Sequence, residues 1–281
     1  MPDTETLLKG LAWFIPALIF LVLISLRLFD EDNKVDLGSL KKIIWETRGG
    51  AFILLLIALA VKVENFVKDQ THFVGFEATS LFYQIEGVEH VVFLQNHLGK
   101  WLIINSASLF YILGLTYFVV FIPLFYLARG EKENFLFFSK GLAVNYMFIL
   151  PGYFLLHVTV TSYQAGAVEP VMYSNEQYLA ILKLINRLSN CFPSGHVSIS
   201  LTITLIALFK AKLKRLGIFG IIFTVLTGFV IIFLGVHWLL DIVAGVIVGV
   251  VSYHLVSEGK LDFIFDPIMN FFERKTEHLF S

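Results

Sequence analysis

The chain has 281 residues, of which 57% are hydrophobic and only 15% are charged, and 29 of them are phenylalanine. This composition is far from that of a typical soluble domain. The formal net charge of −1 argues against nucleic acid as a bulk partner. We therefore expect an integral membrane protein whose partners are membrane lipids.

Apolar runs of about 20 residues, the length that a helix needs to cross a bilayer, recur along the chain. They predict an all-α membrane protein, a helical bundle with about seven transmembrane helices, near residues 8–27, 45–63, 101–128, 137–160, 194–211, 216–236 and 237–256. The last two are expected to form a hairpin with almost no loop. No internal repeat or long linker interrupts the chain, so residues 1–281 are predicted to form a single membrane domain.

Two segments between the predicted spans are longer than a turn, residues 64–100 and residues 161–193. Both mix aromatic and aliphatic residues with polar ones, a pattern that suits amphipathic helices lying in the membrane interface. They fall on the same side of the predicted bundle. We expect them either to cover a site on that side or only to pack in the interface.

The distribution of basic residues predicts the orientation of the chain. Lys and Arg in alternate loops number 15 on one side and six on the other. The side rich in Lys and Arg is usually cytoplasmic, which places the N-terminus outside and the C-terminus inside. The loop of residues 210–215 contains three lysines and Arg215, and is the sharpest marker of the inner side.

The first motif that carries chemistry is Pro193-Ser194-Gly195-His196, at the start of an apolar run. Proline suits the first turn of a helix because it has no N–H group to leave unpaired there. Ser194 and Gly195 would expose backbone N–H groups at the positive end of the helix dipole, where a phosphate binds well. His196 would then lie at the mouth of this phosphate cradle.

The second motif pairs His237 with Asp241, four residues apart and therefore on one face of a helix. A carboxylate bonded to one ring nitrogen fixes the tautomer and leaves the other nitrogen free to attack. It also stabilises the imidazolium that forms. An acid within an apolar helix is costly, so Asp241 is a candidate functional residue. Two predicted spans separate His196 from His237, which brings both to the outer side.

At these residues the chain resembles the type 2 phosphatidic acid phosphatase superfamily over roughly residues 100–256. The family's middle block, Pro-Ser-Gly-His, is intact, and the His and Asp of its third block match His237 and Asp241. The resemblance implies that His237 is the nucleophile and forms a phosphohistidine. It also implies that His196 is the general acid, that Asp241 orients His237, and that Ser194 and Gly195 bind phosphate oxygens.

The chain departs from the family pattern at its basic residues. The Ser-Arg pair of the third block falls on Val230 and Ile231, and the first block, Lys, six residues, Arg-Pro, has no match. A phosphate dianion in a partly dry site requires compensation, usually by arginine. The nearest bases on the predicted outer side are Lys183 and Arg187, which we expect either to bind phosphate or to face solvent and lipid headgroups.

The leading hypothesis is a membrane phosphoesterase that hydrolyses a lipid phosphate or diphosphate, such as phosphatidate or a polyprenyl diphosphate, on the extracytoplasmic or lumenal face. The arginine-poor third block also resembles that of lipid phosphotransferases such as inositol phosphorylceramide synthase, which pass the phosphorylated headgroup to an alcohol. A third hypothesis is a non-catalytic scaffold or transporter. The mechanism requires no cofactor, and no spacing in the sequence indicates a metal site.

Overall fold

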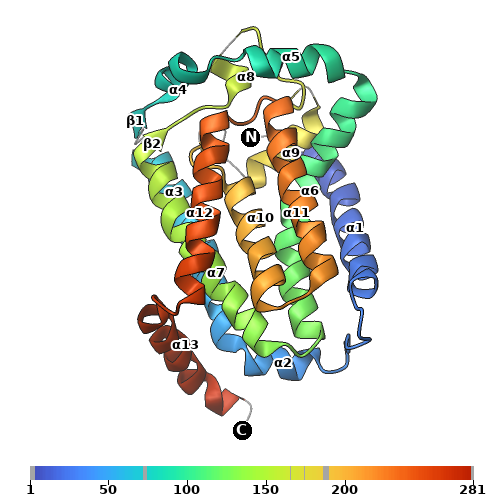
Figure 1. Cartoon of the computed structure of the whole chain (residues 1–281), viewed down its shortest axis with the longest axis vertical. Coiled ribbons are helices and arrows are strands. Elements are labelled where there is room, and N and C mark those ends of the chain that lie inside the picture. The colour runs from blue at the N-terminus through green and yellow to red at the C-terminus, as the bar shows by residue number, and fades with distance from the viewer. Residues whose placement is uncertain (1–3, 72–74, 165, 174, 186–189, 280–281) are drawn as a thin grey trace.

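The computed structural model describes residues 4–71, 75–164, 166–173, 175–185 and 190–279, whose helices form one elongated bundle (Figure 1). Its long helices are α1 (Thr4–Leu28), α3 (Arg48–Thr71), α6 (Trp101–Ala128), α7 (Lys132–Leu155), α10 (Gly195–Leu205) with one π-helical turn η1 (Ile206–Lys210), α11 (Lys214–Phe233) and α12 (Leu239–Ser257). The shorter elements are α2 (Leu40–Glu46), β1 (Phe76–Glu77), α4 (Thr79–Glu86), α5 (Glu89–Leu98), β2 (Leu156–His157), α8 (Thr161–Gln164), α9 (Glu176–Ile185), α13 (Asp262–Thr276) and η2 (Glu277–Leu279).

The predicted spans correspond in order to these long helices, and the prediction of an all-α membrane bundle is confirmed. Within the described residues, six helices are long and apolar enough to cross a membrane, and the seventh predicted span is the shorter apolar helix Gly195–Lys210. The outward faces of the helices are apolar: Val225 is 68% exposed and Ile247 is 59% exposed. Such faces are costly in water but suit a lipid environment, so the chain is a multi-pass membrane protein.

The C-terminal ends of two predicted spans differ most from those in the structure. The span predicted to end at residue 63 continues to Thr71, because Glu64 and Lys68 pair with each other inside the last turns of α3. The span predicted to reach residue 160 ends at Leu155. The chain then forms β2, which pairs in parallel with β1, so that Phe76 faces Leu156. Hydropathy marks where apolar residues stop, whereas a helix continues wherever its polar side chains find partners.

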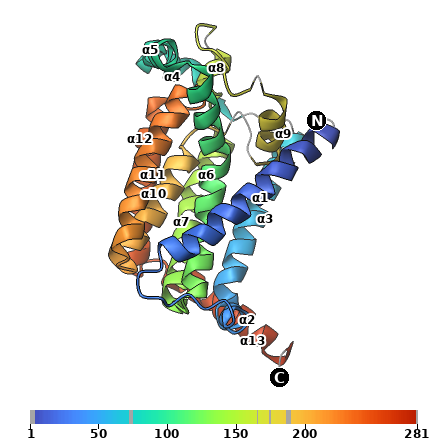
Figure 2. The same cartoon turned by 90° about the vertical axis from the view of Figure 1, so that its right-hand side faces the viewer.

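The two ends of the bundle differ in what covers them. Helices α4 and α5, from the segment predicted to be interfacial, lie across one end, which is the end where α1 begins (Figures 1 and 2). The C-terminal helix α13 lies at the opposite end, as does the basic loop between η1 and α11. Lys140 of α7 binds α13 there, with its Nζ 2.6 Å from carboxylate oxygens of both Asp262 and Asp266.

Helices α10 and α12 are packed against each other through two glycines of α12. A Cβ atom on Gly245 would lie 2.8 Å from the Ser194 carbonyl oxygen, and one on Gly249 would lie 2.9 Å from the Ser198 carbonyl oxygen. Small residues four apart let two membrane helices approach to backbone contact. This approach matters for function because each of the two sequence motifs lies at the start of one of these helices.

Substituting Gly245→Ala is expected to destabilise the protein by about 1–3 kcal/mol, because the new methyl group meets backbone that cannot turn away. The measurement is thermal unfolding in detergent, followed by circular dichroism. Gly228→Ala in α11 is the matched control, since its Cβ would have only Ile242 Cδ1 near it, at 3.9 Å. The control should be neutral or up to about 1 kcal/mol more stable, through the higher helix propensity of alanine. Equal shifts for both variants would contradict the packing argument.

Candidate active site

The first motif forms the start of α10, as the sequence predicts. Ser194 is the N-cap residue, and its Oγ accepts a hydrogen bond from the Val197 N–H at 3.4 Å. Gly195 lies against α7: a Cβ atom there would be 2.6 Å from the Tyr153 hydroxyl oxygen. Glycine therefore allows a tyrosine hydroxyl to approach the cradle backbone. The start of α10 thus carries the positive end of the helix dipole beside Tyr153, as the sequence suggested.

The second motif lies where α11 turns into α12. Helix α11 ends in a Schellman motif: the Val236 N–H bonds to the Ile231 carbonyl, and the Gly235 N–H bonds to the Ile232 carbonyl. Gly235 has a φ of +68°, which a glycine adopts without strain. This turn reverses the chain within a few residues and places His237 directly before α12. The predicted hairpin with almost no loop is present.

Asp241 bonds both to the preceding backbone and to His237. Its Oδ2 accepts the Trp238 N–H at 2.9 Å and lies 3.0 Å from His237 Nδ1. One carboxylate thus caps α12 and fixes the imidazole, with Nδ1 as the donor and Nε2 left for other contacts. Both side chains are buried, at 0% exposure for Asp241 and 2% for His237.

The fold brings the two histidines together. The rings of His196 and His237 are 5.9 Å apart between centroids and nearly perpendicular, at 67°. Tyr111 of α6 stacks on the other side of His196, with centroids 4.5 Å apart. The Ser194 N–H donates to the Asp241 carbonyl oxygen at 3.0 Å, which ties the two motifs by backbone. The catalytic roles of His196, His237 and Asp241 remain predictions, but their side chains meet at one place.

Helix α4 is attached to this site through Glu86. Its two carboxylate oxygens accept the N–H groups of Leu239 and Leu240 at 2.8 Å and 2.9 Å. Partial burial raises the pKa of Glu86 above the usual carboxyl value, although these two bonds act in the opposite direction. The first N–H groups of α12 are thereby bonded to a side chain of the interfacial segment and are not available to a phosphate.

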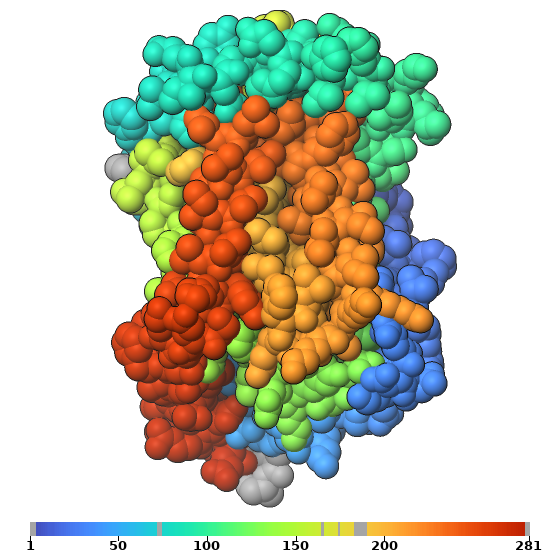
Figure 3. Space-filling model, viewed as in Figure 1, coloured from blue at the N-terminus to red at the C-terminus, as the bar shows by residue number. Residues whose placement is uncertain are grey.

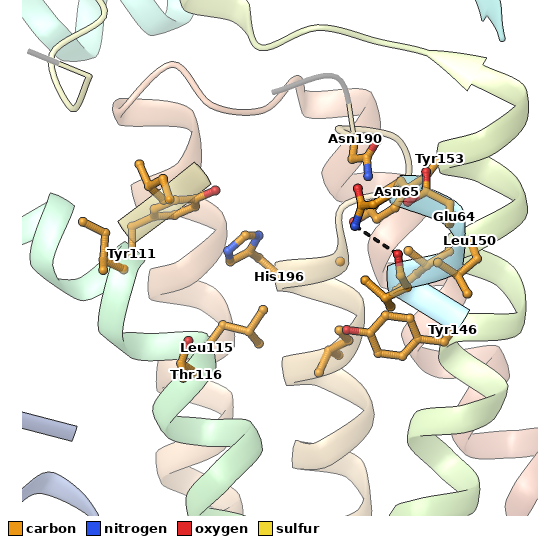
Figure 4. A pocket seen from close by; sticks show the side chains of 16 residues that line it. Glu64, Asn65, Tyr111, Leu115, Thr116, Tyr146, Leu150, Tyr153, Asn190 and His196 are labelled. Carbon is orange, nitrogen blue, oxygen red and sulfur yellow. Dashed lines mark hydrogen bonds between the residues drawn. The ribbon is translucent and has the colours of Figure 1, made fainter. Parts of the chain in front are cut away.

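A cavity of about 120 Å³ adjoins His196 on the side of α3, α6 and α7 (Figure 4). His196 extends toward it from α10, opposite Tyr111, while Tyr146 and Tyr153 line it from α7 (Figure 4). Glu64 and Asn65 of α3 line it as well, together with Asn190 from the loop before the cradle. The cavity therefore combines one candidate catalytic group with a polar wall that lies outside both motifs.

Lys68 of α3 is a described basic side chain that contacts the loop leading into the cradle. Its Nζ donates to Asn190 Oδ1 at 2.8 Å and to the Tyr153 carbonyl at 2.6 Å, and lies 2.8 Å from Glu64 Oε1. In this arrangement Lys68 holds the cradle loop in place and is paired with Glu64.

The residues proposed to replace the missing arginines lie largely outside the described structure. Arg187 lies outside the described residues, and Lys183 belongs to α9 but its side chain is not described. The position of the family's arginine is Ile231, which is completely buried in the apolar core with Val230. The phosphate-binding roles of Arg187 and Lys183 therefore remain predictions.

One cluster within the described residues has the composition of a metal site. Ligand atoms of Cys191, His237 and Asp241 lie within 4.8 Å of one another, and all three residues are buried. Sulfur, nitrogen and oxygen donors of this kind suit a zinc-like ion. In the structure His237 and Asp241 instead form a hydrogen bond with each other. That the reaction needs no metal ion remains a prediction. Cys191, the single cysteine of the chain, forms no disulfide, and its Sγ donates to the Val236 carbonyl oxygen at 3.6 Å.

Sequence reasoning missed the contribution of α3 and α6 to the site. Glu64 and Lys68 carried a usable signal, because two opposite charges four residues apart at the end of an apolar run are suited to pair on one helix face. Because the predicted span ended at residue 63, the prediction left both residues outside the helix that contains them in the structure, α3. Tyr111 carried no such signal, since an aromatic residue within an apolar helix is ordinary.

Comparison with protein families agrees with this geometry. Residues 155–260 match the family model of the PAP2 superfamily, and the matched stretch contains the cradle, both histidines and Asp241. Helices α3, α6 and nearly all of α7 precede it. The chain has no significant match among curated proteins or solved structures. The match confirms the resemblance to this superfamily that is seen in the two motifs.

Proposed function

We propose that the protein is a membrane-embedded enzyme that removes the phosphoryl group of a lipid phosphate or diphosphate through a phosphohistidine on His237. The observation that carries the proposal is the hydrogen bond between His237 Nδ1 and Asp241, 3.0 Å long, beside His196. Superfamily membership supports a phosphoesterase or phosphotransferase function acting on lipids. The particular lipid and the mechanism are our inference.

In the proposed first step, His237 Nε2 attacks phosphorus, and the bond between phosphorus and the lipid oxygen breaks. His196 gives its proton to that oxygen, so the lipid leaves as a neutral alcohol. Asp241 stabilises the positive charge on the phosphorylated imidazole, as the acid of a serine-protease triad does for its histidine. In the second step His196 takes a proton from the incoming water, whose oxygen displaces His237 from phosphorus.

The phosphate would be bound at the start of α10, beside Ser194 and Gly195 and at the positive end of the helix dipole. The Ser194 N–H is already donated to the Asp241 carbonyl oxygen, so the Ser194 hydroxyl and the Gly195 backbone are the groups we propose for this contact. Ile231 contributes no charge here, and Lys68 is paired with Glu64. Lys183 and Arg187 are the bases we propose for this role, since both precede the cradle in sequence. A substrate with lower charge than a phosphomonoester dianion would also need less compensation, which favours a phosphodiester or a transferase reaction as the second candidate function.

The lipid tail is proposed to lie in an apolar groove of about 610 Å³ on the surface of the bundle. Val197 of α10, Phe229 of α11 and Ile242 of α12 are among its lining residues. Figure 3 shows the same face, where α10 is visible between α11 and α12. Because Val197 directly follows the cradle, a lipid held here from the bilayer would have its phosphate beside His196. We also propose that this end of the bundle faces the extracytoplasmic or lumenal side, with the basic loop on the cytoplasmic side.

The test is an assay of detergent-purified protein with phosphatidate and a polyprenyl diphosphate, in which both inorganic phosphate and new phospholipids are quantified. We expect phosphate release from at least one of these lipids, unchanged by EDTA, together with an acid-labile, base-stable phosphoprotein after rapid quenching. Loss of activity with EDTA and its return with zinc would instead assign Cys191, His237 and Asp241 to a metal. No turnover of any lipid phosphate would favour the non-catalytic hypothesis and overturn the proposal.

A further inference from the structure

The cavity beside His196 has features that hydrolysis alone does not require. Its volume of about 120 Å³ is that of roughly four water molecules in the liquid. Its lining comes mainly from α3, α6, α7 and α10, and only the last of these carries a sequence motif (Figure 4). Apolar residues such as Ile149 and Ile199 form part of its wall, and polar residues form the rest. It is thus shaped for a small molecule that carries both C–H and polar groups.

A buried ion pair lies in the polar wall. Glu64 and Lys68 are 7% and 8% exposed in their side chains, and their charged atoms approach to 2.8 Å. Glu64 Oε2 is buried and has no hydrogen-bond partner among the described residues. A buried carboxylate oxygen that accepts no hydrogen bond is costly, and a ligand with a donor group removes that cost. Lys68 makes no hydrogen bond to Oε2: its Nζ lies beside Oε1, and its hydrogen bonds go to Asn190 and Tyr153.

The charge of the wall restricts the ligand. The negative charge of Glu64 disfavours an anionic ligand in the cavity. The positive charge of Lys68, which is paired with Glu64, disfavours a protonated amine. A neutral molecule with several hydroxyl groups can donate to Glu64 and also accept from amide or phenol donors in the wall. We propose that this cavity binds a small polyhydroxy alcohol, which accepts the phosphoryl group from His237. This inference rests on the proposed function and specifies the acceptor at that same site.

The chemistry follows from the position of His196. A nucleophile that attacks phosphohistidine must lose a proton to a base beside it, and His196 is the candidate base that lines the cavity. An alcohol there would form a new P–O bond while the bond between phosphorus and His237 Nε2 breaks and its electron pair returns to that nitrogen. The alcohol proton goes to His196, which restores both histidines. With the cavity filled only by water, the same steps give inorganic phosphate.

The experiment uses full-length protein in detergent with a radiolabelled lipid phosphate, in the presence of glycerol or myo-inositol. 1-Propanol serves as the matched alcohol with a single hydroxyl group. We expect phosphorylated glycerol or phosphorylated inositol to form at the expense of inorganic phosphate, with saturation, and no comparable product from 1-propanol. Glu64→Gln should lower the ratio of transfer to hydrolysis by about tenfold, the effect of losing one hydrogen bond to a charged group. Total turnover should fall far less.

Two further variants keep the test decisive. Leu115→Phe narrows the cavity without removing a charge, and should lower the transfer ratio even if Glu64→Gln fails to fold. Glu5→Gln removes the acid of an exposed ion pair of the same spacing, Lys9 with Glu5 in α1, and should leave the ratio unchanged.

Phosphate release without transfer to either polyol would overturn the cavity proposal and leave the proposed function standing. An unchanged ratio in Leu115→Phe and Glu64→Gln would also overturn it. Absence of phosphohistidine and of every product would refute the proposed function itself.

Discussion

Replacing His237 with alanine is expected to lower the turnover of a lipid phosphate by about 10⁴-fold or more, since loss of a nucleophile removes the covalent route entirely. Asp241→Asn should cost about 10³- to 10⁴-fold, as in other histidines that lose their orienting carboxylate. The structural reason is the 3.0 Å bond from His237 Nδ1, which an asparagine amide cannot hold in the same tautomer. Turnover and the amount of quenched phosphoprotein are measured together, and His237→Ala should show no phosphoprotein.

The matched control lies on the same helix. His254 of α12 also pairs with an acid four residues later, Glu258, at 2.6 Å, but this pair is exposed and stands at the other end of the helix. His254→Ala should retain normal turnover. Because Asp241 also caps α12, thermal unfolding of Asp241→Asn must be compared with that of the native protein. Normal phosphate release by folded His237→Ala would disprove the proposed mechanism.

His196→Ala is expected to lower turnover of an alkyl lipid phosphate by about 10²- to 10⁴-fold, the usual contribution of a general acid. The reason is that an alkoxide is a poor leaving group unless it receives a proton as the bond breaks. The loss should be much smaller with p-nitrophenyl phosphate, whose leaving group needs no proton. Rates are measured for both substrates under single-turnover conditions, so that the first step is isolated.

The dependence on the leaving group separates His196 from His237. A nucleophile variant should be inactive toward both substrates, whereas a variant lacking the general acid should discriminate between them. His97→Ala is the control, because His97 is exposed in α5 and its Nδ1 contacts only the Phe93 carbonyl of its own helix among the bonds described. Equal losses of His196→Ala on both substrates would argue that His196 positions phosphate and does not transfer a proton.

The fold was predictable from the sequence because a membrane imposes a simple rule on each segment by itself. A run of apolar residues long enough to span the bilayer must be helical, since no water is present to satisfy an open backbone. The order of the seven spans follows from this rule. The errors lie at segment ends, as in α3, where Glu64 and Lys68 form an ion pair and the helix continues past its apolar part.

The candidate site was predictable where its residues are close in the sequence and where the number of spans between two motifs places both on one side, as for His196 and His237. His237 and Asp241 meet because four residues make about one turn of a helix, and Ser194 caps a helix through its own neighbours. The absence of the family's arginine could also be read directly, and the structure adds that Ile231 is a core residue. The roles assigned to His196, His237 and Asp241 stay predictions until the variants above are assayed.

The sequence by itself determined the membrane environment, the number of spans and the two motifs, because composition and helical spacing act over short stretches of chain. Only the tertiary structure decided what surrounds His196: Tyr111 stacked on its ring, and the cavity lined by Glu64 and Tyr146. These groups come from α3, α6 and α7, far from the cradle in sequence. Whether these groups meet depends on how closely the helices approach one another. Gly195 and Gly245 allow a close approach because they have no side chain, and no local sequence pattern shows which neighbour each glycine will contact.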